Sequence, residues 1–270
     1  MKKLALLPFV LLLILSCTAT SPQPNWADLS STHVFAGEPQ GQAIQVLKNQ
    51  RWSLGYDEEK KNPAWSAYAL GPIAHKKHKR VSRFSVDRRT QSRVKHGDYT
   101  NTGYSRGHMA PSYGIYSRLG KDAQKETYLC SNICPQKQKH NGGIWLKLEA
   151  TVAGDGKGEG GWAEKYGKVF VICGPIYDLD STATLPAGIA IPDAFYKILV
   201  RIEDETIQAL AFLIPHAPDQ TGGKWGELAT YLTSVDDVEA KTSLDFMSDL
   251  PDALEAEVER RTAAGIWASD

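Results

Sequence analysis

The stretch SNICPQKQKHNGGIWLKLEATV, residues 131 to 152, combines two patterns with helical spacing. Asn141, Trp145 and Glu149 recur every four residues, which stacks their side chains along one face of a helix. A second, apolar row at positions 144, 148 and 152 lies about 100° away and is suited to a core. The pattern therefore predicts a helix that begins near Asn141, buries one stripe and presents an amide and a carboxylate on the neighbouring stripe.

These residues also have ordinary structural explanations. Asn141 is of a type that commonly caps a helix, and Glu149 would fit an exposed helix face. The upstream stretch YSRGHMAPSYG, residues 104 to 114, places His108 two residues after Arg106 among small and flexible residues. Taken together, the two stretches favour a functional site over four unrelated polar residues.

The most basic part of the chain lies just before this histidine. Residues 75 to 96, HKKHKRVSRFSVDRRTQSRVKH, hold nine Lys or Arg residues and a single acidic residue, Asp87. A long solvated loop often reaches such a charge without any ligand, but the position upstream of His108 favours a surface that faces phosphates. The chain has 31 basic and 31 acidic residues in total, so only this local excess would attract an anionic polymer.

The remaining pattern predicts one mixed α+β domain of about 225 residues. Apolar, β-branched segments bounded by turn residues predict strands within 43–57, 64–71, 168–178, 196–204 and 206–215. Asp204 and Glu205 would form the turn of a hairpin between the last two segments. Helix-like segments follow within residues 222–232 and within the acidic tail, residues 236–261.

The N-terminal part is predicted to lie outside this domain. Two lysines precede an apolar run of twelve residues, which is the layout of a signal peptide and is short for a membrane span. We assign residues 1–16 to the signal and residues 17–42, rich in Pro, Ser, Thr and Gly, to a linker. The folded domain then extends over residues 43–260.

The position of Cys17 indicates how the N-terminal segment is processed. The sequence ILSC, residues 14–17, resembles a lipoprotein processing box, so we expect cleavage before Cys17 and lipid attachment to it. Cleavage a few residues later would leave a soluble secreted protein instead. In both cases we expect export, either to the periplasm or outer membrane through the lipid or to the medium. Three cysteines then remain, an odd number, and a zinc site built from two of them with His140 lacks an obvious fourth ligand.

The order and spacing of the polar motifs resemble the DNA/RNA non-specific endonuclease family with the ββα-metal finger. Members carry Asp-Arg-Gly-His, then Ser-Asn-x-x-Pro-Gln, then Asn-x-Gly-x-Trp with a Glu four residues later. This chain has SRGH at 105–108, SNICPQ at 131–136, and NGGIW at 141–145 followed by Glu149. The likeness covers about residues 45–255. It implies an α+β, ββα-metal nuclease fold with a central, mainly antiparallel sheet flanked by helices, and makes residues 43–260 an endonuclease domain.

The resemblance assigns the chemistry to three of these side chains. It makes His108 the general base, a role suited to a group whose pKa lies near neutrality. Asn141 would be the single direct ligand of Mg²⁺, with Mn²⁺ as the second candidate ion. Glu149 would hold metal-bound water and could shift into direct coordination.

Two arginines would clamp phosphate oxygens. Arg106 lies within the histidine motif itself, and Arg83 lies within the basic run. The match in the basic run is loose, so Arg80 or Arg88 could take the place of Arg83.

Four further residues are expected to support the site. Ser105 stands where the family motif has Asp, and we expect it to act as a local hydrogen-bonding support that leaves the enzyme active. The other expected supporting residues are Asn132, Gln136 and Trp145.

These assignments predict a metal-dependent endonuclease that hydrolyses phosphodiester bonds of DNA and RNA without sequence preference. Its partners would be DNA and RNA, bound through the phosphate backbone, and a membrane only through a lipid on Cys17; the sequence carries no indication of oligomeric state. The main competing hypothesis is a catalytically impaired relative that binds nucleic acid at the cell envelope. The sequence also leaves open a phosphodiesterase for small or lipid-linked phosphates and a purely structural envelope lipoprotein.

Overall fold

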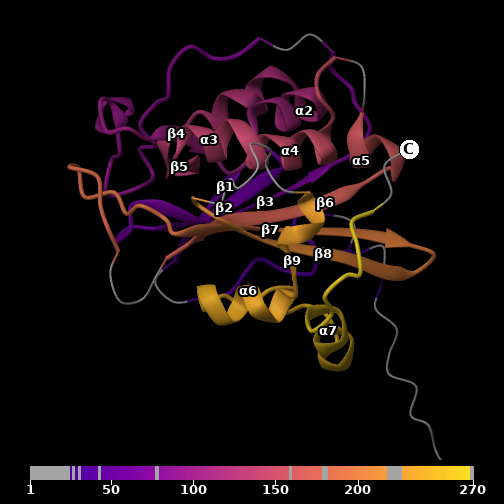
Figure 1. Cartoon of the computed structure of the whole chain (residues 1–270). Helices are drawn as coiled ribbons and strands as arrows, with labels where there is room; N and C mark the ends of the chain where they lie inside the picture. The colour runs from indigo at the N-terminus through magenta and orange to yellow at the C-terminus, as the bar shows by residue number, and fades with distance from the viewer. Residues whose placement is uncertain are drawn as a thin grey trace, which may run out of the picture.

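A seven-stranded antiparallel sheet forms the centre of the computed structural model (Figure 1). Its strands lie in the order β1-β2-β3-β6-β7-β8-β9. Their bounds are β1 Ile44–Asn49, β2 Trp52–Asp57, β3 Asn62–Leu70, β6 Val169–Ile176, β7 Ala194–Glu203, β8 Thr206–Pro215 and β9 Leu232–Thr233. The predicted strands and the predominantly antiparallel sheet are therefore confirmed.

The structure describes residues 25, 28–29, 32–41, 44–76, 79–157, 160–177, 182–217 and 227–267. The predicted signal at residues 1–16, Cys17 and much of the predicted linker lie outside the described residues. Within the described part of the chain, no helix is both long enough and apolar enough to cross a membrane.

The longest pairing in the sheet is the hairpin of β7 and β8. Ten residue pairs connect the two strands, from Ala194 opposite Pro215 to Glu203 opposite Thr206. The connecting residues Asp204 and Glu205 have φ angles of 48° and 57°. Positive φ at both positions is typical of a tight two-residue hairpin turn, so the predicted turn is also confirmed.

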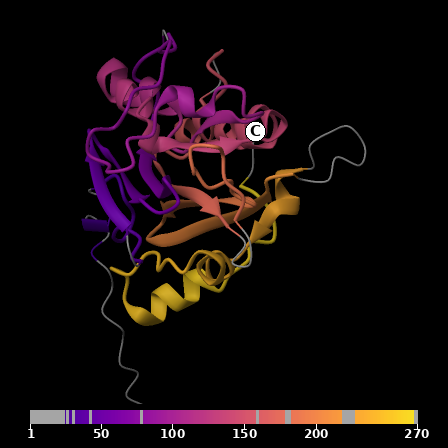
Figure 2. The ribbon, with the colours of Figure 1, turned by 90° about the vertical axis from the view of Figure 1, so that its left-hand side faces the viewer.

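Helices cover both faces of this sheet (Figure 2). One face packs against α2, α4 and α5, and the other packs against α6 and α7 (Figure 1). The bounds of these helices are α2 Ser112–Thr127, α4 Leu146–Ala153, α5 Gly161–Lys165, α6 Val235–Thr242 and α7 Asp252–Glu259. Because strand side chains alternate between faces, β7 contributes Phe195 and Leu199 to the core on the α4 side and Tyr196 and Ile198 to the core on the α6 side.

A small unit of two strands and a helix packs on the α4 side of the large sheet. Strands β4 (Ser105–His108) and β5 (Ile133–Gln136) pair antiparallel, with His108 opposite Ile133. A helical run follows directly, made of α3 (Gln138–His140), the π-helical turn η3 (Asn141–Trp145) and α4. This succession is the ββα finger that the motifs predict.

The predicted buried face of the helix is confirmed, but the predicted first residue is wrong. The predicted apolar row, Ile144, Leu148 and Val152, is buried in the core. The helical run begins at Gln138, so Asn141 lies inside the run and does not cap it. The physical reason is the wide turn at Asn141–Trp145, where Gly143 adopts φ −110° and ψ −110°, a conformation that a residue without a Cβ reaches easily.

The predictions for the C-terminal part were partly wrong. Residues 222–226 of the segment predicted to be helix-like lie outside the described residues. Its remainder forms only a short 3₁₀ turn, η4 (Leu228–Tyr231), and then pairs with β8 as β9. The acidic tail contains α6 and α7 as predicted, and Ser234 caps α6 by accepting a hydrogen bond from the backbone N–H of Asp237 at 3.1 Å.

The only acidic residue of the basic run, Asp87, anchors that run to the fold. Its buried carboxylate accepts hydrogen bonds from Arg89 Nη2 at 2.7 Å and from Ser131 Oγ at 2.6 Å. Burial acts to raise the pKa of Asp87, but the hydrogen bonds from Arg89 and Ser131 outweigh it, and the pKa is lowered. The stability that Asp87 contributes is therefore complete above its ordinary value of 3.8 and is lost as pH falls through the lower pKa of the folded state.

Replacing Asp87 by Asn should destabilise the protein. The neutral amide removes the charge of the ion pair with Arg89 and one of the two acceptor oxygens, so we expect a loss of about 2–3 kcal/mol at pH 7, measured by urea unfolding. The difference in unfolding free energy between the two proteins should narrow below about pH 4, where Asp87 of the unfolded chain takes up a proton before the native carboxylate does. Asp122→Asn, at an exposed acid paired with Lys125, is the control and should leave the midpoint unchanged. A difference in unfolding free energy that stays constant down to pH 3 would contradict this account.

Candidate active site

The side-chain amide of Asn132 joins the segments that surround His108. Its Oδ1 accepts hydrogen bonds from the backbone N–H of Ala110 at 2.9 Å and from Ser66 Oγ on β3 at 3.2 Å. Its Nδ2 donates to the carbonyls of Ala110 and Thr127, both at 3.0 Å. An amide has two donors and two lone pairs, so all four are used. Asn132 is thus a supporting residue with no lone pair left for a metal ion.

His108 ends strand β4 and is held between aromatic rings. Its ring centroid lies 5.1 Å from that of Phe84 and 4.9 Å from that of Tyr128. Trp145 Nε1 donates a hydrogen bond to the backbone carbonyl of His108 at 3.2 Å, which ties the helix to the strand. Burial, with a smaller effect from the charge of Arg80, lowers the pKa of His108 to about 3. The imidazole is therefore neutral near pH 7, and its enclosed Nε2 has no hydrogen-bond partner among the described residues.

Asn141 and Glu149 lie on the helical run beside this histidine. Asn141 is half-buried, and its backbone N–H donates to the carbonyl of Lys137 at 2.9 Å. Glu149 Oε1 is enclosed without a hydrogen-bond partner within the described part of the chain. Burial raises the pKa of Glu149 to about 7, although the charges of Lys197 and Arg80 act in the opposite direction. A carboxylate in this state gains from a nearby cation.

Lys197 is a site residue that the sequence analysis missed. It is only 1% exposed, and its Nζ lies 4.1 Å from the centroid of the Trp145 ring. No described residue forms a hydrogen bond with this ammonium group. Strand β7 points Lys197 to the same face as Phe195, toward the helix that carries Glu149. The signal in the sequence was a single lysine inside the continuous apolar run FYKILV.

The basic run reaches the site through Phe84. The Phe84 ring packs against His108 and, on another side, stacks with His96 at 6.0 Å. Ser85 fixes this part of the run, because its N–H donates to the carbonyl of Tyr128 and its carbonyl accepts from Cys130 N–H. The run is thereby attached directly beside the histidine.

The arginines of the run differ in what they act on. The described basic residues of the run are all exposed. The charge of Arg80 lowers the pKa of both His108 and Glu149, whereas the charge of Arg83 acts on His96. Electrostatics therefore place Arg80, the alternative to Arg83, closer to the acid–base groups.

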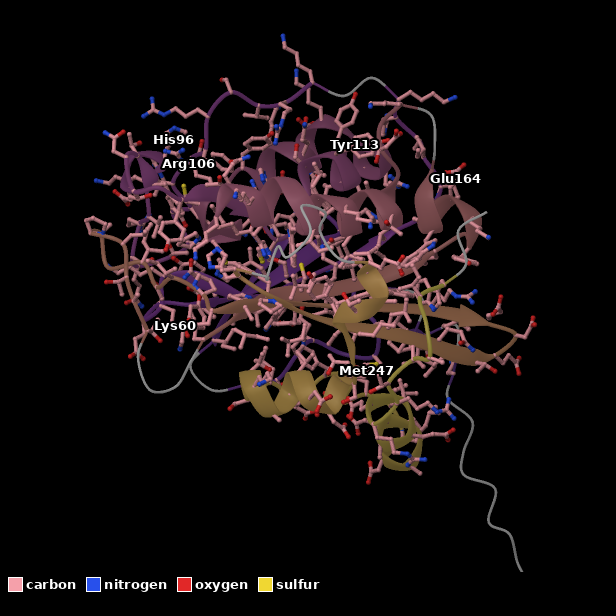
Figure 3. All side chains as sticks on the ribbon, in the orientation of Figure 1. Lys60, His96, Arg106, Tyr113, Glu164 and Met247 are labelled. Carbon is pink, nitrogen blue, oxygen red and sulfur yellow. The ribbon has the colours of Figure 1, made fainter. Side chains whose placement is uncertain are left out.

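Arg106 is engaged with a neighbouring turn. Its Nε and Nη2 donate to the carbonyl of His96 at 3.0 and 2.6 Å, and Nη2 also donates to Thr100 Oγ1 at 3.0 Å. Figure 3 shows Arg106 and His96 next to each other at the end of the molecule that carries β4 and β5. In this conformation Arg106 supports the turn η1 (His96–Tyr99), so only part of its guanidinium remains available for an anion.

Ser105 and Gln136 lie opposite each other at the open end of the β4–β5 pair. Ser105 Oγ donates a hydrogen bond to Gln138 Oε1 at 2.5 Å, which connects β4 to the start of α3. Gln136 is fully buried and packs over Gly107, where an added Cβ would lie only 2.0 Å from Gln136 Oε1. The glycine of the SRGH motif is thus a steric requirement of this side chain.

Two further histidines, His140 at the end of α3 and His216 after β8, also lie near the site. The sequence analysis did not identify them as site neighbours. The buried His140 ring stacks on Trp145 at 5.8 Å and lies 5.5 Å from the ring of His216. Burial lowers the pKa of His140 to about 3 and also lowers that of His216. His216 Nε2 accepts from Lys137 N–H at 2.7 Å, so its Nδ1 carries the proton that it shares with the carbonyl of Pro192.

The cysteines take no part in a disulfide in the described part of the chain. Cys130, Cys134 and Cys173 are buried and unpaired. Cys130, Cys134 and His140 do not converge on a common metal position. The described residues contain one cluster of potential metal-binding His, Cys, Asp or Glu side chains, and it lies elsewhere.

The candidate site therefore combines a neutral histidine, an amide oxygen, an enclosed carboxylate and an exposed basic run. Amide and carboxylate oxygens are the ligands that hard divalent cations prefer. The unpartnered Glu149 Oε1 shows that this donor set fits such an ion. Within the fold, these groups can bind a phosphate, accept a proton and hold a metal ion.

Comparisons with known proteins identify the family and the fold of this chain. A sequence model of the DNA/RNA non-specific endonuclease family matches residues 30–253 of the chain. The protein named "Nuclease" from Nostoc sp. is 26% identical over 92% of this chain and 94% of its own length. "Mitochondrial nuclease" of Saccharomyces cerevisiae is 27% identical over 82% of this chain and 73% of its own length. "Nuclease EXOG, mitochondrial" of Danio rerio is 28% identical over 73% of this chain, which spans only 59% of that relative's length.

Among solved structures, a chain of the EndoG/EndoGI complex shares the fold. The superposition has a TM-score of 0.63 at 23% identity, and it covers 86% of this chain and 95% of that chain. This likeness confirms the ββα-metal nuclease architecture that the motifs predict. Because the family model spans most of the sequence, the chain belongs to the DNA/RNA non-specific endonuclease family.

Proposed function

We propose that this nuclease is a metal-dependent endonuclease that hydrolyses phosphodiester bonds in both DNA and RNA, with His108 as the general base. The observation that carries the proposal is the pair of enclosed, unpartnered atoms, His108 Nε2 and Glu149 Oε1, on two residues whose pKa values are both lowered by the charge of Arg80. The Trp145–His108 hydrogen bond links the elements that carry these two residues. The basic run, attached through Phe84, supports a phosphate polymer as the substrate.

The divalent ion would be Mg²⁺, with Mn²⁺ as the second candidate. Asn141 would hold it directly, and Glu149 would hold it through water. When bound, the ion would neutralise charge that develops on the phosphate and on the departing oxygen. Lys197 and Arg80 keep Glu149 closer to its ionised form, because their positive charges oppose the effect of burial on its pKa.

His108 would take the proton of the attacking water on Nε2. The low pKa keeps the imidazole of the free enzyme neutral at pH 7, and Nε2 accepts a proton in the tautomer that carries its hydrogen on Nδ1. A phosphate beside the ring would favour the imidazolium and raise its pKa, which improves the histidine as a base when substrate is bound. Phe84 and Tyr128 restrict the orientation of the ring, and Asn132 fixes the backbone that follows it.

Contacts with the substrate would be made mainly to its backbone. The exposed basic run offers positive charge without base-reading geometry. We also retain export, with lipid attachment at Cys17, as a proposal that rests on the composition of the first residues. The catalytically impaired relative stays the second candidate, because Ser105 occupies the position of the motif aspartate.

His108→Ala should abolish cleavage of plasmid DNA and of RNA in Mg²⁺, lowering the rate by at least about 10²-fold. Binding of both polymers at low salt should persist, because the basic run is untouched. EDTA should have the same effect on the parent enzyme as the substitution. His33→Ala, in the segment that packs on the opposite face of the sheet, is the matched histidine control and should retain cleavage. A parent protein that binds but never cleaves would favour the impaired relative.

Arg80→Ala and Arg83→Ala should have different effects. Removing the Arg80 charge beside His108 and Glu149 should lower kcat by about 10-fold or more. Removing Arg83 should mainly weaken binding and reduce the slope of log Kd against log salt by about one. Steady-state kinetics and binding at several salt concentrations separate the two effects. A larger loss of kcat for Arg83→Ala would restore the assignment made from sequence.

Lys197→Met should raise the Mg²⁺ concentration that the enzyme requires without lowering the stability of the fold. The substitution removes the charge that lowers the pKa of Glu149, so that pKa should rise above about 7 and the ionised fraction at pH 7 should fall. We expect the Mg²⁺ concentration for half-maximal activity to rise by up to about 10-fold at pH 7. The difference should shrink at pH 9, where Glu149 is ionised in both proteins.

The melting temperature is the control for this variant. A methionine of similar volume replaces a buried, unpartnered ammonium, so the melting temperature should stay equal or rise. A lower melting temperature together with an unchanged Mg²⁺ requirement would assign Lys197 to stability alone.

A further inference from the structure

Three carboxylates converge on the side of the sheet that faces away from the candidate active site. Asp236 and Glu239 lie on α6, and Glu259 is the last residue of α7. One oxygen of each lies within 4.8 Å of the others. Helices α6 and α7 pack on the sheet face opposite α2 and α4 (Figure 1).

Glu259 distinguishes this cluster from an ordinary acidic surface. Its side chain is only 6% exposed. Its Oε1 is enclosed without a hydrogen-bond partner among the residues that the structure describes. A buried carboxylate oxygen without a donor is unfavourable unless a proton or a cation compensates it.

The surroundings of Glu259 supply further negative charge. Burial raises the pKa of Glu259 to about 8, and the neighbouring carboxylates Glu239, Glu255, Asp236 and Asp245 add to this effect. Glu259 also ends α7, where the carbonyl groups of the last turn favour a cation. Strand β8, which packs against both helices, contains no charged residue. The nearby basic side chain of Arg261 pairs with Glu257.

One carboxylate of the cluster is held in a fixed orientation, and one side of the cluster is open to solvent. Glu239 Oε1 accepts a hydrogen bond from the backbone N–H of Phe246 at 2.8 Å, which restrains the orientation of that carboxylate. Asp236 is exposed, so the cluster opens to solvent at one side while Glu259 closes the other.

We propose that Asp236, Glu239 and Glu259 form a binding site for a divalent cation, specifically Ca²⁺. Calcium binds oxygen ligands at about 2.3–2.6 Å in irregular geometry, and three carboxylate oxygens that lie within 4.8 Å of one another can share such an ion. Magnesium requires a tighter octahedron with ligands at about 2.0–2.1 Å. Three carboxylates from two helices, completed by water, match the irregular coordination that calcium accepts.

Such an ion would join α6 to α7. It would stabilise the helical layer on the sheet face opposite the nuclease site and would leave the chemistry of that site unchanged. The proposal is independent of the metal ion proposed for catalysis.

The test uses the full-length protein carrying Asn141→Ala, which removes the proposed catalytic metal ligand. Saturating Ca²⁺, at about 100 times its Kd, should raise the melting temperature by about 5–10 °C relative to EDTA. Equilibrium dialysis should show one Ca²⁺ per chain. Adding Glu259→Gln should remove both the shift and the binding. Adding Glu257→Gln on the same helix should retain both, because that carboxylate is paired with Arg261.

The metal-free proteins show whether the variant folds. In EDTA at pH 9, Glu259→Gln should melt at a temperature equal to or above that of its parent, because it removes a carboxylate from a repulsive cluster. If Glu259→Gln does not fold, the exposed Asp236→Asn provides the same test of Ca²⁺ binding. A full Ca²⁺ shift in the variant, or no shift in the parent at about 10 mM Ca²⁺, would overturn the site. An equal shift with Mg²⁺ would overturn the assignment of calcium.

Discussion

Four hydrogen bonds to one buried amide hold together the part of the molecule that carries the candidate active site. The side chain of Asn132 binds Ala110, Thr127 and Ser66, which belong to the segment after β4, the end of α2 and strand β3. A buried hydrogen bond contributes about 1 kcal/mol, whereas an orphaned buried group costs about 1–3 kcal/mol. Because every donor and acceptor is used, no other side chain of similar size satisfies the same three segments. The position of His108 depends on these hydrogen bonds, because His108 directly precedes Met109 and Ala110.

The polar groups around the helix have the opposite character. Glu149 Oε1, Lys197 Nζ and His108 Nε2 are enclosed, yet they lack a hydrogen-bond partner within the described part of the chain. Folding encloses them because the helix and sheet around them bury Trp145, Phe195 and Leu148. Enclosing these groups lowers the stability of the fold. Their charge states can in turn respond to an incoming ion or phosphate. The lack of hydrogen-bond partners therefore destabilises the fold and is also what suits these groups to the proposed reaction.

The sequence predicted the strands well because their signals are local. The β7–β8 hairpin follows from two apolar runs and a two-residue turn, and the core row of the helix follows from its spacing. The start of the helix was missed because the wide turn at Asn141–Trp145 depends on packing against β4, which no local pattern encodes.

The site was predicted in part for a related reason. The linear motifs identify His108, Asn141 and Glu149, but the contributions of Phe84, Lys197 and His140 arise from contacts between residues far apart in the chain. The choice between Arg80 and Arg83 is of the same kind, because a loop of uniform charge does not reveal which arginine faces the histidine.

The contact between Gly107 and Gln136 has a consequence for how this sequence can change over evolutionary time. The Gln136 amide lies where a side chain at position 107 would begin. A larger residue at 107 therefore requires the Gln136 side chain to move away or to become smaller. The two positions, 29 residues apart in sequence and on neighbouring strands, are expected to change together.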